Sequence, residues 1–293
     1  DTMNEIYFCC VRREGNSMAQ ILCSTGALIG RPNNRDYRLL EDLSKQLHCD
    51  GFEFMMYDSW YEQAEDIVAF LQKLNLHIPV MHCEKRMGEA ISRGTEADLE
   101  EAFRLFTINC DVAHRIGAKK MVVHLWDGIT SDQNIENNIK AYGELAKIAA
   151  NYGVEILVEN VVCNKQDPLT HWCELVQAYP DIKFIFDTKM AAFHNQLELL
   201  YKEEYQWLSE KHIKHYHVND YAGGYMDWAN LKTLPIGKGH IDFDKFFAYI
   251  KAIGYEDTFT VESTAFGADG SVDVEMLNAQ FAYMRKKLEN PPE

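Results

Sequence analysis

One pattern repeats along most of the chain: a short apolar strand ends in polar residues, and an amphipathic helix follows it. The eight predicted strands are Gln20–Ser24, Gly51–Met56, Ile78–His82, Lys120–Leu125, Glu155–Asn160, Lys183–Asp187, Ile213–Asn219 and Thr258–Glu262. The predicted helices between them include Tyr37–Leu47, Glu96–Ile116, Ile135–Asn151 and Asp244–Ile253. Glycines that suit a helix end follow the last three, at positions 117, 153 and 254. Strands alternating with helices of this length indicate parallel β–α–β units.

Eight such units favour an α/β fold of the closed (β/α)₈ TIM-barrel type. A doubly wound sheet is the alternative, but no glycine-rich phosphate loop follows the first predicted strand. No Pro/Gly/Ser-rich linker divides the chain, so residues 1–293 are predicted to form a single domain. Residues 1–18 precede the repeat as a short N-terminal extension, and their apolar run Ile6–Val11 suits an extra strand or a hairpin.

Charge narrows the classes of partner. The formal net charge is −16, which argues against a nucleic-acid substrate because such binding rests mainly on Lys and Arg side chains that neutralise phosphates. No apolar run is long enough to span a bilayer, and the start of the chain has no signal-peptide pattern. We therefore expect a cytoplasmic protein with no membrane partner; association into a homo-oligomer stays open.

The eight cysteines show neither a C-x-x-C pair nor a zinc-finger spacing. Several of them, including Cys9, Cys10 and Cys23, lie in apolar, strand-like runs. This usage favours buried free thiols in a reducing compartment over a disulfide framework.

Acidic and histidine side chains recur at the predicted strand ends. In a TIM barrel the active site lies at the C-terminal ends of the strands. Seven of the eight predicted strands place an acid or a histidine there, namely Glu53, His82, His124, Glu159, Asp187, His217 and Glu262. Scattered surface charge would not recur in phase with the repeat, so these side chains are predicted to meet at one rim.

The last four of these strands predict a metal centre of Glu159, Asp187, His217 and Glu262. Three carboxylates and one imidazole form a hard, oxygen-rich site, which suits one divalent cation; Mn²⁺, Mg²⁺ or Co²⁺ is favoured and Zn²⁺ stays open. Period-two alternation puts His215 on the same strand face as His217 but farther from the rim, as a satisfied core histidine. The alternative for each acid taken alone is an ordinary strand-end residue facing water.

Several segments resemble the xylose isomerase-like barrel superfamily, which includes sugar isomerases and epimerases, inosose-processing enzymes and the endonuclease IV class. The matching segments are VMHCEK (80–85), VVHLWDG (122–128), ILVEN (156–160), FIFDT (184–188), HYHVND (215–220), PIGKGHIDF (235–243) and FTVES (259–263). The resemblance implies that Glu159 and Glu262 both hold the metal and move protons. It also implies that Asp187 and His217 complete the coordination.

Some positions differ from the pattern of the family. In the endonuclease members, histidines matching His82 and His124 bind additional zinc ions, but two further zinc ligands are missing here, at Met190 and Ala229. That loss argues against a three-zinc nuclease. Many ketose epimerases carry a substrate-binding histidine at the position of Met190 and an arginine at the position of Gly223, so their sugar pocket does not carry over.

The favoured function is therefore a divalent-metal-dependent sugar isomerase or epimerase that transfers a proton through an enediolate of a small polyol or sugar. Glu159 and Glu262 are the predicted catalytic bases and acids. The predicted substrate-binding residues are His82, His124, Lys189 and Trp126, while His194, Trp228 and Phe266 are further candidates near the loops. Alternatives are an inosose-type dehydratase on the same metal site, an endonuclease IV-like zinc phosphodiesterase and a sugar-binding barrel without catalysis.

Overall fold

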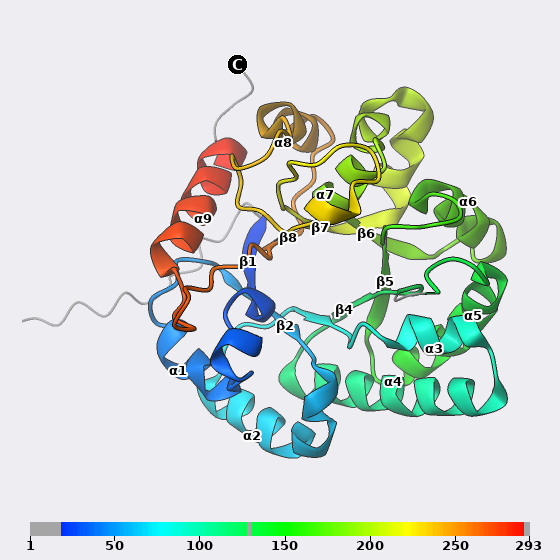
Figure 1. Ribbon diagram of the computed structural model, residues 1–293, viewed down its shortest axis with the longest axis horizontal. Helices are drawn as coiled ribbons and strands as arrows, with labels where there is room; N and C mark the ends of the chain where they lie inside the picture. Colours follow the sequence, from blue (N-terminus) through cyan, green and yellow to red (C-terminus); the bar gives the residue numbers. More distant parts are fainter. Residues whose placement is uncertain (1–18, 128–129, 290–293) are drawn as a thin grey trace, which may run out of the picture.

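The computed structural model describes residues 19–127 and 130–289, and within them eight parallel strands close into a barrel (Figure 1). The strands are β1 (Gln20–Ser24), β2 (Gly51–Met55), β3 (Val80–His82), β4 (Lys120–Val123), β5 (Glu155–Glu159), β6 (Lys183–Asp187), β7 (Ile213–His217) and β8 (Thr258–Val261). Neighbours in the chain pair with one another, and β8 pairs with β1 to close the ring. The predicted TIM barrel is confirmed. The predicted N-terminal extension, with Cys9 and Cys10, lies outside the described residues.

Helices surround the ring of strands (Figure 1). They are α1 (Leu40–Leu43), α2 (Ala64–Leu74), α3 (Met87–Arg93), α4 (Glu96–Ile116), α5 (Ile135–Asn151), α6 (Pro168–Ala178), α7 (Thr188–Phe193), α8 (Phe243–Ala252) and α9 (Val274–Glu289). Local chemistry sets the ends of α4: the Thr95 hydroxyl accepts the Asp98 N–H at its start, and Gly117, at φ 88°, ends it. The predicted bounds of α4 and α5 are confirmed.

The predicted helix Tyr37–Leu47 is wrong in extent. A 3₁₀ turn covers Tyr37–Leu39, and α1 ends at Leu43. Next to this end, the Ser44 hydroxyl donates to the Glu41 carbonyl, the kind of local bond by which serine competes with helix hydrogen bonding. Leu39, expected on the apolar side, is 37% exposed.

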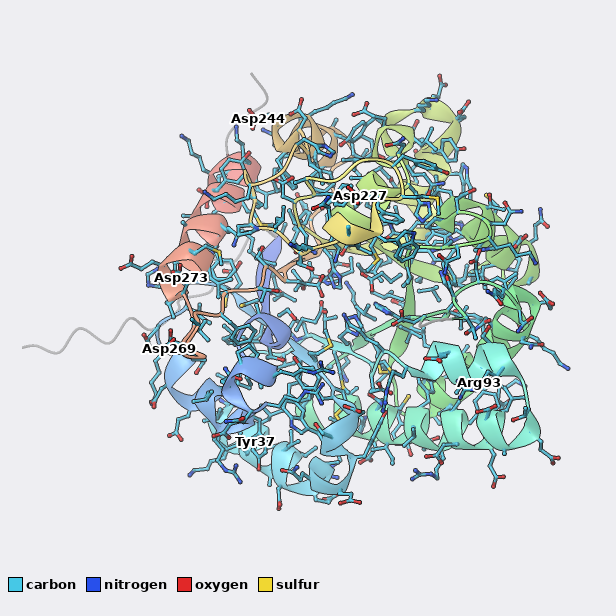
Figure 2. All side chains as sticks on the ribbon, viewed as in Figure 1. Tyr37, Arg93, Asp227, Asp244, Asp269 and Asp273 are labelled. Carbon is cyan, nitrogen blue, oxygen red and sulfur yellow. The ribbon has the colours of Figure 1, made fainter. Side chains whose placement is uncertain are left out.

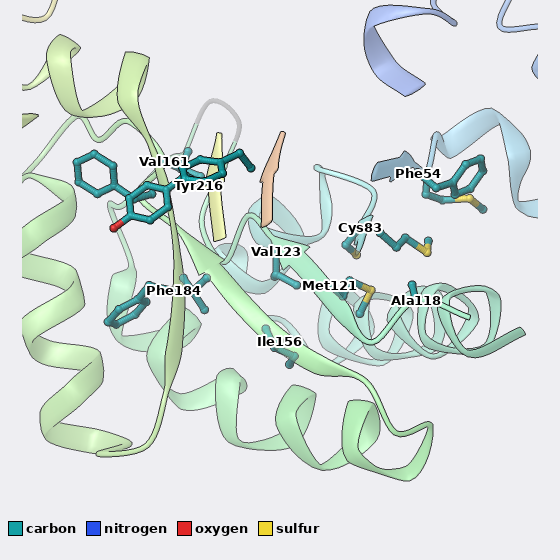
Figure 3. Close-up of a cluster of buried hydrophobic side chains, with 14 of the residues drawn as sticks. Phe54, Cys83, Ala118, Met121, Val123, Ile156, Val161, Phe184 and Tyr216 are labelled. Carbon is teal, nitrogen blue, oxygen red and sulfur yellow. The ribbon is translucent and has the colours of Figure 1, made fainter. Parts of the chain in front are cut away.

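The outer faces of the strands carry large apolar side chains that pack against the helices. Figure 3 shows part of this layer, with Met121, Val123, Ile156 and Phe184 projecting from successive strands. Phe184 stacks on Trp172 of α6 with ring centroids 4.1 Å apart. Burying one such side chain contributes about 1.5–3 kcal/mol, so this layer holds the strand ends in fixed positions.

The inner faces of the strands form a separate interior. A cluster of Leu22, Val80, Val122, Leu157 and Ile185, one from each of five strands, fills its lower part. Because side chains alternate along a strand, the next inward-facing residue two positions later belongs to the upper layer. On β3, β5 and β6 these residues are His82, Glu159 and Asp187. The barrel thus has an apolar floor beneath a polar layer at the C-terminal ends of the strands.

The strands are shorter than predicted at several ends, so that His124 and Glu262 are the first residues after β4 and β8. Among the described residues no helix is long and apolar enough to cross a bilayer. The six described cysteines are free thiols; Cys49 and Cys173 are only half-buried, in contrast to the expectation that all would be buried.

Candidate metal centre and active site

The structure brings Glu159, Asp187, His217 and Glu262 together. One ligand atom from each lies within 4.8 Å of those of the others. His217 Nδ1 is 3.0 Å from Glu159 Oε1 and 3.2 Å from Glu262 Oε2. Three of these side chains are completely buried or nearly so, and Glu262 is 11% exposed at its side chain. The sequence prediction named this group, and its geometry is that of a compact site around a common centre.

Neighbouring groups fix the carboxylates in place. Asp187 lies at the end of β6 and caps α7, because its Oδ1 accepts the Met190 N–H at 2.9 Å. Its Oδ2 accepts from the Asn219 side-chain amide, which also donates to Glu262 Oε2 at 2.9 Å. The Asn219 amide oxygen accepts the Glu262 N–H. Asn219 therefore joins two of the predicted ligands, a role that the sequence analysis missed.

Glu53 supports His217 from the side opposite the carboxylates. Its Oε2 lies 3.0 Å from His217 Nε2 and 2.9 Å from His215 Nε2, and it accepts the Thr260 hydroxyl at 2.8 Å. This contact leaves Nδ1 of His217 to face Glu159 and Glu262. Carboxylate–histidine pairs of this kind orient metal-ligating imidazoles and make them more basic. His215, completely buried and also bonded to the Thr258 hydroxyl, is the satisfied core histidine that was expected.

The electrostatics of the site is dominated by buried carboxylates close to one another. Burial would raise the pKa of Glu159, but His124 and His217 hold it well below its usual value. Burial raises the pKa of Asp187, and the charges of Glu159 and Glu262 raise it further. Burial opposes the charge on His217, yet Glu262, Glu53 and Glu159 raise its pKa well above the ordinary value. The four side chains together therefore favour the binding of a positive charge, either a proton or a cation.

These residues fit a divalent cation. Their donors are carboxylate oxygens and one imidazole nitrogen, the set that hard or borderline metals prefer. Glu159 Oε2 is buried and has no hydrogen-bond partner among the described residues. The His124 Nε2 atom lies 2.6 Å from this oxygen, and a bound cation would add a further partner while offsetting the repulsion between the acids.

His82 and His124 lie beside the same glutamate. Their Nε2 atoms are 3.6 Å and 2.6 Å from Glu159 Oε2, and neither makes a hydrogen bond in the described part of the chain. The second ring nitrogen of each is satisfied, by the Cys83 carbonyl and by Asp127. Burial would lower the pKa of His124, but the charges of Asp127 and Glu159 raise it to about 9. Both histidines thus direct one nitrogen at Glu159, and His82 is completely buried.

A cavity of about 380 Å³ opens above the carboxylates. It is lined by Ser24, Gly26, Arg31, Arg35, Met55, Met56, Tyr57, Asp58, Glu84, Lys85, Arg86, Glu159, Lys189, Met190, Thr233, Glu262 and Thr264. Both Glu159 and Glu262 face it. Of the predicted substrate-binding residues, Lys189 lines the cavity and donates to the Thr233 hydroxyl at 3.0 Å.

The other proposed contact residues lie elsewhere. Trp126 is completely buried, and its indole donates to the Val161 carbonyl, so it offers no face to a sugar; that assignment is wrong. His194 uses its Nε2 to accept the Cys163 N–H rather than facing the cavity. Trp228 is 47% exposed and does not line the cavity. Neither does Phe266, whose ring lies against Gly30.

Local contacts hold the loop after β7, which contains Gly223 and Asp227. A side chain at Gly223 would meet the Tyr221 hydroxyl, since a Cβ there would lie 2.3 Å from it. Asp227 lies in the loop beyond β7 (Figure 2). Its carboxylate accepts from the Asn230 amide at 2.7 Å. Gly223 and Asp227 therefore contribute to the conformation of this loop.

A second buried polar cluster surrounds Asp132. Its carboxylate accepts the backbone N–H groups of Asn164, Lys165 and Gln166 at 2.8–2.9 Å. It also pairs with His171 Nε2 at 2.9 Å, and His171 Nδ1 contacts Glu174. Both carboxylate oxygens of Asp132 have hydrogen-bond partners, so the cluster fastens the loop after β5.

The chain is similar in sequence to known proteins. A sequence model described as xylose isomerase-like TIM barrel matches residues 42–286. An uncharacterized protein of Methanocaldococcus jannaschii is 28% identical over 185 residues, which are 57% of this chain and 60% of that protein. The chain thus spans less than two thirds of that relative.

Solved structures share the fold over almost the whole chain. D-Allulose 3-epimerase from Methylomonas sp., in complex with D-allulose, aligns with a TM-score of 0.67 at 17% identity and covers 93% of this chain and 100% of that one. D-Psicose 3-epimerase with D-tagatose from Clostridium cellulolyticum H10 aligns with a TM-score of 0.69 at 14% identity, covering 92% and 100%. An IOLI protein with a bound zinc atom has a TM-score of 0.68 at 18% identity, covering 93% and 100%. At these identities the likeness concerns the fold.

Proposed function

The chain belongs to the xylose isomerase-like TIM barrel family, and within it we propose a divalent-metal-dependent sugar isomerase or epimerase. One observation carries the proposal: Glu159 and Glu262 flank the same His217 imidazole and both line the cavity. Two carboxylates that face one substrate space are what a proton removal and a proton return require. The names of the similar structures, two of them sugar epimerases, agree with this chemistry.

Glu159, Asp187, His217 and Glu262 would hold one divalent cation. When bound, that cation supplies Lewis acidity, which stabilises negative charge developing on the carbonyl oxygen of the substrate. The oxygen-rich donor set favours Mn²⁺, Mg²⁺ or Co²⁺, and the zinc in the similar IOLI structure keeps Zn²⁺ among the candidates.

The glutamates divide the proton transfer between them. One removes the proton from the carbon next to the carbonyl, and the electron pair of the C–H bond moves to form an enediolate. The other returns a proton to the opposite face of the same carbon, which is epimerisation. Alternatively it returns the proton to the neighbouring carbon while the hydroxyl proton moves from one enediolate oxygen to the other, which is isomerisation. Each such acid–base step supplies on the order of 10²–10⁴ in rate. Asn219 holds Glu262 in place for its part.

A metal-dependent phosphodiesterase is the second candidate, because His82, His124 and Glu159 form a neighbouring group whose ligand atoms also lie within 4.8 Å of one another. Against it stand the net charge of −16 and the absence of a histidine at Met190 and Ala229. A nick released at an abasic site in a duplex oligonucleotide would favour this candidate.

The test combines metal content with hydrogen exchange. We expect elemental analysis of the Mn²⁺-loaded, desalted protein to give about one ion per chain, and Asp187→Asn to lose it. Incubation of ketoses with the loaded protein in D₂O should then replace a carbon-bound proton by deuterium, seen by NMR. Absence of bound metal, or of exchange across free, phosphorylated and oxidised ketoses, would overturn the proposal.

A further inference from the structure

The cavity above the carboxylates is rich in cationic side chains although the chain as a whole carries a net charge of −16. Five of its lining residues are basic: Arg31, Arg35, Lys85, Arg86 and Lys189. Four are acidic, and two of these, Glu159 and Glu262, belong to the proposed metal centre, whose negative charge a divalent cation offsets. The part of the cavity that faces a substrate therefore has five cations against Asp58 and Glu84 alone.

Two of the cations are already engaged with those acids. Arg35 Nη1 lies 2.9 Å from Asp58 Oδ1, and Arg86 Nη2 lies 2.8 Å from Asp58 Oδ2. Arg86 also contacts Glu84 through Nε at 3.2 Å. Asp58 thus holds two guanidinium groups side by side, and these four residues leave no excess charge.

The backbone around Arg35 is strained in a way that supports a role for this loop. Asn34 and Arg35 both adopt left-handed backbone conformations, at φ 58° and 51°, although neither is glycine. Such residues are held only when their surroundings require it, and they concentrate at functional sites. The Arg35 guanidinium lies over the Tyr57 ring at 4.6 Å, which fixes its direction at the cavity wall.

Arg31 and Lys85 remain. Both side chains line the cavity, and neither makes a hydrogen bond or an ion pair within 4.0 Å to a residue that the structure describes. Arg31 is exposed, and the Lys85 ammonium interacts at longer range with the carboxylates of Glu262 and Glu159. They come from different loops, after β1 and after β3. Lys189, the fifth cation, lies 3.8 Å from Asp187 and is partly engaged there.

From these contacts we propose that the substrate is an anionic sugar whose terminal oxyanion group, a phosphate or a carboxylate, binds to Arg31 and Lys85. The inference rests on the proposed function, since it takes the substrate to be a sugar held at the carboxylate end of the cavity. A guanidinium forms paired hydrogen bonds with such groups and an ammonium adds a point charge. A cavity of about 380 Å³ falls in the size range of small-ligand sites, about 300–1,000 Å³.

The test uses one carbon skeleton with three end groups: fructose, fructose 6-phosphate and fructuronate. Their affinities for the Mn²⁺-loaded protein are measured by calorimetry at low salt, and C–H exchange in D₂O is measured in parallel. We expect one anionic sugar to bind at least tenfold more tightly than fructose, because charged hydrogen bonds of this kind change affinity roughly tenfold or more each. The preferred anion separates phosphate from carboxylate.

Variants locate the effect. Arg31→Met and Lys85→Met should each remove most of the preference, whereas the control Arg38→Met, an exposed arginine outside this cavity, should keep it. Equal affinity for all three sugars, or a preference that survives both variants, would overturn the inference. If the three sugars bind equally but their C–H protons exchange, the anion site is rejected and the proposed function stands. An anion preference without exchange would keep the anion site and reject the proposed chemistry.

Discussion

The candidate metal site of Glu159, Asp187, His217 and Glu262 and the cluster around Asp132 are both groups of carboxylate and imidazole side chains, but their partners differ. Asp132 is satisfied by three backbone N–H groups and by His171. Its pKa lies well below the usual range because these hydrogen bonds outweigh its burial. Glu159 and Asp187 instead lie in one group with Glu262 and His217, and Glu159 Oε2 makes no hydrogen bond among the described residues although His124 Nε2 lies 2.6 Å from it.

The difference shows what separates a structural polar cluster from one arranged for a ligand. Backbone donors are part of the fold, so a carboxylate that they satisfy contributes to stability whether or not anything binds. Carboxylates directed at one another repel, and the fold tolerates them only through surrounding interactions. Substitutions in the cluster around His217 should therefore affect metal binding and activity, whereas those in the Asp132 cluster should affect stability and leave both unchanged.

The largest effect is expected for Glu159→Gln and Glu262→Gln. Each amide keeps the shape of the side chain but cannot take up a proton, so C–H exchange in D₂O should fall by on the order of 10²–10⁴. At neutral pH the free energy of unfolding of the metal-free protein should fall in both variants, because the lowered pKa values of Glu159 and Glu262 mean that their ionised forms stabilise the fold. Glu144→Gln, on the exposed surface of α5, is the matched control and should exchange at the wild-type rate. Near-normal exchange in both site variants would reject the assigned roles.

A bound metal ion should stabilise the folded protein through the cluster that contains Asp187 and not through the cluster around Asp132. At a free cation concentration of 100 times Kd, binding to the folded state adds about 2.7 kcal/mol to the free energy of unfolding. Asp187→Asn should lose this increment, whereas Asp132→Asn should retain it. Denaturant unfolding with and without Mn²⁺ measures the increment in both variants. An equal increment in both would show that the cation binds elsewhere.

Much of the fold, and the grouping of the candidate metal ligands, could be predicted because the signals are local. Helix ends and strand periodicity lie within short windows, and parallel strands bring their C-terminal ends to one rim. Asp187, His217 and Glu262 could therefore be placed together from their positions at the ends of strands. The error at Trp126 has a different cause: it follows β4 in a predicted loop, but the side chain turns into the core.

Contacts across the barrel could not be predicted from local sequence patterns. Glu53 was noted as a strand-end acid, but it precedes His217 by 164 residues, and only the closed ring brings their side chains together. Arg31 and Lys85 lie in loops, where no periodicity indicates the direction of a long, flexible side chain. The charge of the cavity is a property of the assembled rim and contradicts the average charge of the chain.

A smaller effect is expected for Glu53→Gln, which tests how far the fold supports the metal centre. The variant removes the charge behind His217 Nε2 but leaves every proposed ligand in place. Substitution of such a partner usually costs about 10–100-fold in metal affinity or activity. Mn²⁺ titration followed by calorimetry measures this, and His217→Ala serves as the reference for complete loss. An unchanged Mn²⁺ affinity would limit Glu53 to a packing role.

The smallest effect, and the one that completes the comparison, is expected for Asp132→Asn. Its amide cannot accept from all the donors around it, so the free energy of unfolding at neutral pH should fall on the order of 1–2 kcal/mol while metal binding stays normal. The pKa of Asp132 is lowered in the folded protein, so its ionised form stabilises the fold above the ordinary aspartate range near 3.8. The wild type should therefore lose its advantage over the variant as the pH falls below about 4. Urea unfolding of both proteins between pH 7 and pH 3 measures this difference, and a constant difference would show that the charge of Asp132 contributes nothing to it.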